Sequence, residues 1–160
     1  MKRNHRNCPG FSLVELLIVI SITAIVSSVS IASYIDFNRA QIVNQAAKKI
    51  VQDLRMAQSL AANNQKPSSG CGTLNAYMFS INHTTKAYTI IPVCTPAYSG
   101  SEIKTGSVSG VSLTGFTSAS FKVLRQGVSM TGGNNLTVSG FGKQKVVVVD
   151  PGGAIYIQGE

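Results

Sequence analysis

The pattern of hydrophobic and polar positions divides the chain into three parts. Residues 16–35 carry no charged side chain and are dominated by Leu, Ile, Val and Ala; as a helix they would cover roughly 30 Å, the thickness of a bilayer core. The pattern then becomes amphipathic, with apolar residues spaced by four and three positions in turn at Val43, Ala47, Ile50, Leu54, Ala57 and Ala61. This spacing predicts a helix with one buried face. Beyond Pro67, short alternating runs between turn residues predict β-strands.

We expect one helix over residues 11–64, about 80 Å long at the standard rise, because Asn63, Asn64 and Pro67 end its pattern. The expected strands are residues 76–81, 87–93, 111–116, 120–124, 136–139, 145–149 and 154–157. The expected fold class is therefore α+β, a long N-terminal helix packed on a C-terminal antiparallel β-sheet domain.

We make a more specific prediction for each of three segments between or within these strands. Residues 82–85 and 150–153 have the composition of hairpin turns. Residues 146–149 form a continuous apolar run, which predicts a central strand covered by the helix on one side. Residues 99–110 are rich in Ser and Gly and predict a long mobile loop.

The basic residues near the start predict the orientation of the apolar run. Lys2, Arg3 and Arg6 precede it with no acidic residue among them, so the N-terminus should stay cytoplasmic and the rest be exported. A secretory signal would have its cleavage site after the apolar region, whereas Pro9 and Gly10 stand before it. Cleavage after Gly10 would remove the basic leader and keep the helix.

Glu15 lies at the edge of the apolar run. An ionised carboxylate costs several kcal/mol in lipid, so Glu15 is either solvated near the headgroups or paired with a cation. Cleavage after Gly10 would create such a cation, the α-amino group of Phe11. Pairing with Phe11 of its own chain or of an adjacent copy would neutralise Glu15, and in the second case would draw neighbouring helices into axial register.

Residues 9–20, Pro-Gly-Phe-Ser-Leu-Val-Glu-Leu-Leu-Ile-Val-Ile, resemble the class III leader and N-terminal helix of type IV pilins and type II secretion pseudopilins. The resemblance implies that a prepilin peptidase cuts between Gly10 and Phe11 and N-methylates Phe11, and that Glu15 takes part in assembly. The implied partners are other pilin or pseudopilin subunits, an inner-membrane assembly platform and the lipid bilayer. The implied location is the inner membrane, as a single-pass protein with a cytoplasmic N-terminus, followed by a periplasmic or extracellular filament.

A second resemblance concerns the later part of the chain. Residues 53–65, Asp-Leu-Arg-Met-Ala-Gln-Ser-Leu-Ala-Ala-Asn-Asn-Gln, precede a β domain that ends in Val-Val-Val-Val-Asp-Pro-Gly-Gly-Ala-Ile-Tyr-Ile at residues 146–157. This arrangement is similar to that of GspH/FimT-like minor pseudopilins and minor pilins. The expected organisation is a cleaved leader, a transmembrane and filament-core helix, an amphipathic helical spine and an exported β domain, at residues 1–10, 11–35, 36–66 and 67–160.

Cys71 and Cys94 are the only cysteines of the expected exported part, since Cys8 lies in the leader. Export into an oxidising compartment makes a disulfide between them the default. Such a bridge would tie together the strands on either side of the turn at residues 82–85. The sequence has no CxxC motif and no paired His, which disfavours a redox or zinc site.

The expected exported domain has a local charge balance of +4, which invites a DNA-binding hypothesis. From Lys66 onward there are seven basic and three acidic residues. Lys122, Arg125, Lys143 and Lys145 lie near glycine-rich turns and are candidate contacts for DNA phosphates. Some minor pilins of the resembling family bind DNA during uptake. The alternative is that these four residues are ordinary solvated surface charges.

Few groups are available for catalysis, because the chain has two His and six scattered carboxylates. We expect no catalytic residue, no metal and no cofactor, and we expect His83 to be a solvated turn residue. Three functions are therefore compared: a filament subunit, in particular a minor one; a DNA-binding minor pilin; and a signal-anchored periplasmic enzyme. Glu15 and the Gly10–Phe11 junction favour the first two, because a plain signal anchor needs neither.

Overall fold

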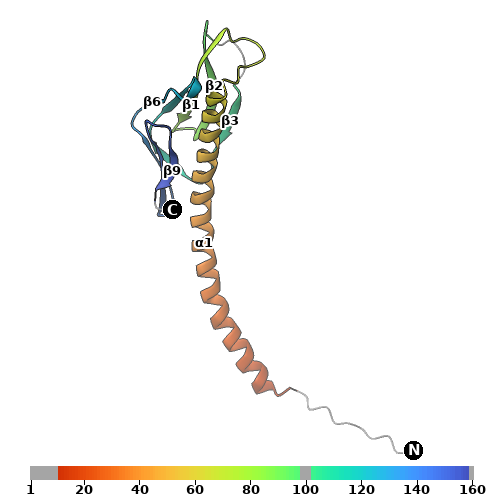
Figure 1. Ribbon diagram of the computed structural model, residues 1–160. Coiled ribbons are helices and arrows are strands. Elements are labelled where there is room, and N and C mark those ends of the chain that lie inside the picture. Colours follow the sequence, from red (N-terminus) through yellow and green to blue (C-terminus); the bar gives the residue numbers. More distant parts are fainter. Residues whose placement is uncertain (1–10, 98–101, 159–160) are drawn as a thin grey trace, which may run out of the picture. The chain divides into compact units, whose positions relative to one another are not determined.

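The computed structural model describes residues 11–97 and 102–158, except the side chains at positions 28–30 and 32. The expected leader, with Cys8 and Gly10, lies outside the described residues. Helix α1 (Leu13–Ala62) is followed by β1 (Thr73–Asn82), β2 (Ala87–Thr95), β3 (Lys104–Ser107), β4 (Ser112–Gly115), β5 (Ser118–Lys122), the 3₁₀ turn η1 (Val123–Arg125), β6 (Val128–Thr131), β7 (Asn135–Gly140), β8 (Lys143–Val149) and β9 (Ile155–Gln158) (Figure 1). The predicted α+β class and the single long helix are confirmed.

The chain divides into two compact units, Met1–Asn38 and Arg39–Glu160. The described part of the first unit is the beginning of α1, where Ser12 Oγ accepts the Val14 N–H at 3.3 Å in the first turn. Ser12 thereby satisfies one of the amide groups that a helix start leaves without a partner.

The second unit contains the rest of α1 and all the strands, joined by one hydrophobic core. The six positions of the predicted apolar stripe on α1 are each at most 1% exposed. Five polar residues off the stripe are exposed, namely Lys48, Lys49, Gln52, Arg55 and Ser59. The amphipathic prediction is therefore confirmed, and the stripe packs on this unit's own strands.

The strands form two antiparallel sheets rather than one. The five-stranded sheet has the order β3-β2-β1-β5-β6, and the four-stranded sheet has the order β4-β7-β8-β9. Phe79 and Phe121 of the first sheet and Leu136 and Val147 of the second are at most 2% exposed and share the core with α1. Strand β8 lies between β7 and β9, as expected of its apolar run.

Both predicted hairpin turns are present. Between β1 and β2, the Asn82 carboxamide oxygen accepts the N–H groups of Thr84 and Thr85 at 3.0 and 3.1 Å. Between β8 and β9, the Asp150 carbonyl accepts the Gly153 N–H at 2.8 Å. Side-chain acceptors and glycine at these positions stabilise the reversals that the composition indicated.

Two strands were missed by the sequence analysis. Strand β3 lies within the expected loop of residues 99–110, of which residues 99–101 are outside the described part, and β6 follows η1. They are the two edge strands of the five-stranded sheet, and neither has a fully buried side chain. Strand β3, Lys-Thr-Gly-Ser, lacks the apolar alternation from which strands are recognised. Strand β6, Val-Ser-Met-Thr, does alternate and packs Val128 and Met130 against the core, but over four residues only.

The expected strand 120–124 ends early, at Lys122. Leu124 and Arg125 have φ angles of 56° and 59°, in the left-handed region, and Leu124 is 63% exposed. This conformation costs a residue with a side chain about 1–2 kcal/mol, and it is incompatible with a continuing strand. The loop from β5 to β6 therefore turns sharply at this point.

The expected membrane-spanning segment was residues 16–35. Among the residues that the structure describes, we find no helix long and apolar enough to cross a membrane. The side chains at 28–30 and 32, which fall inside that segment, are outside the described residues.

Candidate functional site

The first unit exposes an apolar helix surface. Its large apolar side chains are between 44% and 83% exposed, and they are Phe11, Leu13, Val14, Leu16, Leu17, Ile18, Val19, Ile20, Ile22, Ile25, Val26, Ile31, Tyr34, Ile35 and Phe37. Successive helix residues point about 100° apart, so the consecutive residues 16–20 cover every direction around the axis. A helix that is hydrophobic all round needs apolar surroundings.

Two polar side chains within this surface, Ser21 and Thr23, form hydrogen bonds to the helix backbone. Ser21 Oγ donates to the Leu17 carbonyl at 2.7 Å. Thr23 Oγ1 lies 2.9 Å from the Val19 carbonyl and 3.0 Å from the Ile20 carbonyl. Hydroxyl groups with such partners cost less to place in an apolar environment than unpaired ones.

Two of the predicted site residues, Phe11 and Glu15, lie at the start of this surface. Phe11 is 83% exposed and precedes α1, and Glu15 is exposed in the first turn of the helix. A carboxylate in the first turn interacts favourably with the helix dipole. The side chain of Glu15 is therefore available to a cation from another molecule.

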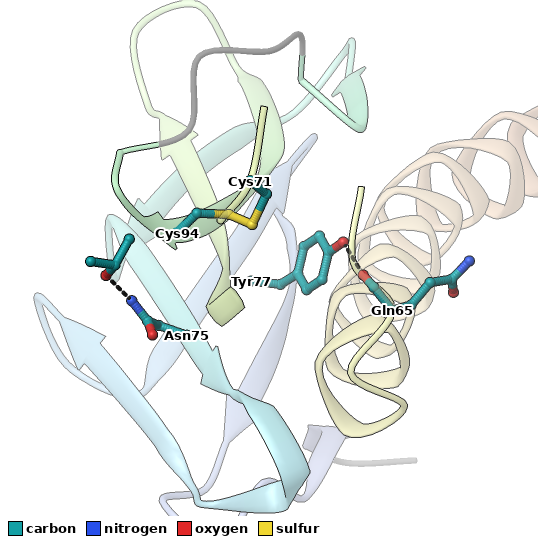
Figure 2. The surroundings of a disulfide bond; sticks show 6 residues. Gln65, Cys71, Asn75, Tyr77 and Cys94 are labelled. Atoms are coloured by element: carbon teal, nitrogen blue, oxygen red, sulfur yellow. Dashed lines mark hydrogen bonds between the residues drawn. A yellow bond between two sulfur atoms is a disulfide. The ribbon is translucent and has the colours of Figure 1, made fainter. Parts of the chain in front are cut away.

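The second unit contains the predicted disulfide between Cys71 and Cys94, whose Cα atoms are 5.5 Å apart (Figure 2). Both residues are 8% exposed. Close by, the Tyr77 hydroxyl donates to the Gln65 carbonyl at 2.6 Å (Figure 2). The bridge and this hydrogen bond fasten the segment between α1 and β1 onto the five-stranded sheet.

A buried polar cluster, which the sequence analysis missed, joins α1 to the edge of the five-stranded sheet. The Asp53 side chain is 3% exposed; it accepts the Tyr88 hydroxyl at 2.5 Å and pairs with the Lys104 ammonium, also at 2.5 Å. Burial, together with the hydrogen bond to Asp53 and its negative charge, raises the pKa of Tyr88 well above its ordinary value, so the hydroxyl stays protonated and donates at neutral pH. The spacing could have predicted that Asp53 is buried, because it lies three residues after Ile50 and four before Ala57, on the apolar face of the helix.

We expect Asp53→Ala to lower the free energy of unfolding by about 2 kcal/mol, mainly because the buried Tyr88 hydroxyl loses its acceptor. The ion pair with the half-exposed Lys104 contributes little to this loss of stability. The matched control is Asp53→Asn, which keeps an oxygen for Tyr88 and should cost less. Urea unfolding followed by circular dichroism measures both, and an Asp53→Ala chain as stable as the parent would contradict a stabilising role.

The four candidate DNA-contacting residues are not brought together. Lys122 and Arg125 line one cavity at the end of β5, whereas Lys143 begins β8 and Lys145 lies two residues later. The β8–β9 turn that borders the cavity follows the other end of β8, a strand of seven residues that spans roughly 20 Å. The structure thus presents two separate pairs of cations.

His83 is not the solvated turn residue that the sequence suggested. It is half-buried, with its Nδ1 3.1 Å from the Leu113 carbonyl, and its buried Nε2 has no hydrogen-bond partner within the described part of the chain. The turn of β1 and β2 packs against β4, so tertiary contacts cover a residue that its own segment would leave exposed. Among the described residues, no group of His, Cys, Asp and Glu side chains could hold a metal ion.

Two comparisons with known proteins found a match, one for a sequence motif and one for the fold. Residues 5–31 match the prokaryotic N-terminal methylation motif. The fold is similar to that of the minor pseudopilin EpsH from the type 2 secretion system of Vibrio cholerae, with a TM-score of 0.54 and 14% sequence identity over 76% of this chain and 99% of that chain. No curated protein sequence matches the chain. The chain thus combines an N-terminal methylation motif with a fold similar to that of a minor pseudopilin.

Proposed function

We propose that the chain is a minor subunit of a type IV pilus or a type II secretion pseudopilus, assembled through the N-terminal half of α1. The observation that carries the proposal is the helix surface of the first unit, which exposes apolar side chains in every direction. In this role the helix lies in the inner membrane before assembly, with its N-terminus cytoplasmic, and in the filament core afterwards. The absence of charge over residues 16–35 and the basic residues before them support this orientation.

The proposal includes processing by a prepilin peptidase, which cuts between Gly10 and Phe11 and methylates the new amino group of Phe11. The methylation motif covers both residues, and Phe11 is highly exposed before the helix begins. Further partners are the other filament subunits, the inner-membrane assembly platform and the lipid bilayer. A structural role is favoured over a signal-anchored enzyme, because pilin and pseudopilin folds are in general non-enzymatic.

DNA binding by the β domain has less support than the role of a filament subunit. A duplex presents one phosphate per strand about every 3.4 Å, and a protein that follows it needs a continuous row of cations. Lys122 with Arg125 and Lys143 with Lys145 belong to separate regions of the second unit, so they do not form such a row.

N-terminal mass spectrometry of the protein recovered from cells with a prepilin peptidase tests the proposed processing. We expect a chain that starts at Phe11 and is heavier by one methyl group than its sequence. The control is the same chain from cells without the peptidase, which should keep the leader. An intact Met1–Gly10 leader in both strains would contradict the processing and leave a signal-anchored protein.

A further inference from the structure

A groove with positive charge runs along the exposed side of α1 in the second unit. One hollow, of about 370 Å³, lies among the last turns of α1, the loop between β5 and β6 and the turn between β8 and β9. A second hollow, of about 470 Å³, lies between α1 and β9. Arg55 lines both hollows, so they adjoin at this residue.

The cations of this groove come from three elements. Arg55 and Lys48 lie on α1, Lys122 ends β5, and Arg125 belongs to the left-handed turn η1. None of the described residues that line the two hollows is acidic. The one buried carboxylate of α1, Asp53, is already paired with Tyr88 and Lys104. The described residues that line the groove therefore supply no carboxylate to Arg55, Lys122 or Arg125.

The groups that could bind an anion are largely unoccupied. Within the described part of the chain, neither the Lys122 ammonium nor the Arg125 guanidinium has a hydrogen bond or an ion pair. Arg55 donates one N–H, from Nη2, to the Ile155 carbonyl at 2.9 Å. That bond holds its guanidinium at the junction of the two hollows, and a guanidinium has five N–H groups in a fork that matches a carboxylate.

The remaining lining suits a peptide rather than a free ion. The part-buried Val128 contributes apolar surface to the first hollow, and Tyr156, which is 44% exposed, and Ile157 contribute it to the second. From Lys48 to Asn63 the helix rises about 22 Å, the length of roughly six or seven residues of an extended chain. We propose that this groove binds an extended acidic segment of a partner protein, with its carboxylates on Arg55, Lys122 and Arg125 and its apolar side chains between them.

Every residue of the groove lies in the second unit, so its binding can be measured whether or not the leader has been cut. The full chain is kept in detergent micelles and titrated into a fluorescein-labelled peptide of alternating Glu and Val residues. The matched probes are the same peptide with Gln in place of Glu and a labelled DNA duplex. Fluorescence anisotropy reports the affinity for each probe.

Two double variants that remove the same charge locate the binding. The first double variant, Lys122→Gln with Arg125→Gln, removes two cations of the groove whose side chains have no partner among the described residues. The second, Lys143→Gln with Lys145→Gln, removes two cations elsewhere. We expect the first pair to weaken binding of the Glu peptide roughly tenfold or more, since charge-assisted hydrogen bonds are lost. The second pair should leave that affinity within about twofold, because screening limits the effect of distant charges.

Three results would overturn the proposal. Equal affinity for the Glu and Gln peptides would mean that carboxylates are not recognised. Equal losses in the two double variants would mean that only net charge matters. Tighter binding of the DNA duplex than of the Glu peptide, reduced in both double variants, would assign the cations to nucleic acid instead.

Discussion

Replacing both Cys71 and Cys94 by alanine is expected to lower the free energy of unfolding by about 3 kcal/mol, relative to the parent under oxidising conditions. The two cysteines are separated by 23 positions, and cross-linking a loop of this size lowers the entropy of the unfolded chain by an amount equivalent to about 3 kcal/mol. The bridge joins β2 to the segment between α1 and β1 and so adds a second covalent connection to the sheet beside the backbone that leads into β1. For a unit of this size the loss corresponds to a fall in melting temperature of roughly 10 °C.

Reduction provides the matched control for this experiment. A reductant should bring the parent's melting temperature down to that of the double variant, and it should leave the double variant unchanged. Cys8→Ser, which lies in the expected leader, should behave as the parent does. Equal melting of parent and double variant without reductant would mean that the disulfide contributes no stability. Leader processing should be the same in all these chains, because Phe11 belongs to the other unit.

Replacement of Glu15 by alanine is expected to leave insertion and cleavage intact but to reduce incorporation into filaments roughly tenfold or more. A factor of ten corresponds to about 1.4 kcal/mol, less than the several kcal/mol that an unpaired charge costs in apolar surroundings. The reason for the loss is that the amine of Phe11 on an adjacent subunit would have no carboxylate to pair with. The readout is the fraction of subunits recovered in sheared filaments, relative to the membrane pool.

Two further variants separate charge pairing from a local effect on the helix. Glu15→Asp keeps the carboxylate and should restore most of the incorporation, whereas Glu15→Gln keeps the size and should not. Since Glu15 also lies in the first turn of α1, loss of its interaction with the helix dipole is the competing explanation. Circular dichroism of the purified chains tests that explanation, since a weakened helix start would lower the helix content. Normal incorporation of Glu15→Ala would mean that the charge pairing is dispensable.

The long helix, its buried stripe and the two hairpin turns could be predicted because each follows from residues close together in the chain. Val43, Ile50 and Leu54 repeat with the period of a helix, and this period alone identifies the face that is buried. In the turns, the side chain of Asn82 and the flexibility of Gly153 act on the adjacent backbone. The Gly10–Phe11 junction and Glu15 are likewise a local pattern.

The pairing of the strands could not be predicted in the same way. Alternation indicates that a segment has a buried face, but it does not identify the neighbouring strand, which depends on backbone hydrogen bonds between distant residues. The division into two sheets therefore appears only in the folded chain. Strand β3 has no apolar alternation, so nothing in its own sequence distinguishes it from a loop, whereas β6 alternates Val128 and Met130 with polar residues over only four positions.

The polar sites of the second unit also depend on tertiary contacts. Asp53 meets Tyr88 and Lys104 only when β2 and β3 pack beside α1. Lys122, Arg125, Lys143 and Lys145 were predicted together because all four are basic and near glycine-rich turns. In the folded chain the first two line a groove with Arg55, and the other two lie on β8. Local patterns of hydrophobicity and turn residues thus determined the helix, the β-rich domain and the apolar N-terminal segment. The contacts of charged side chains required the fold, because they join residues that are far apart in the chain.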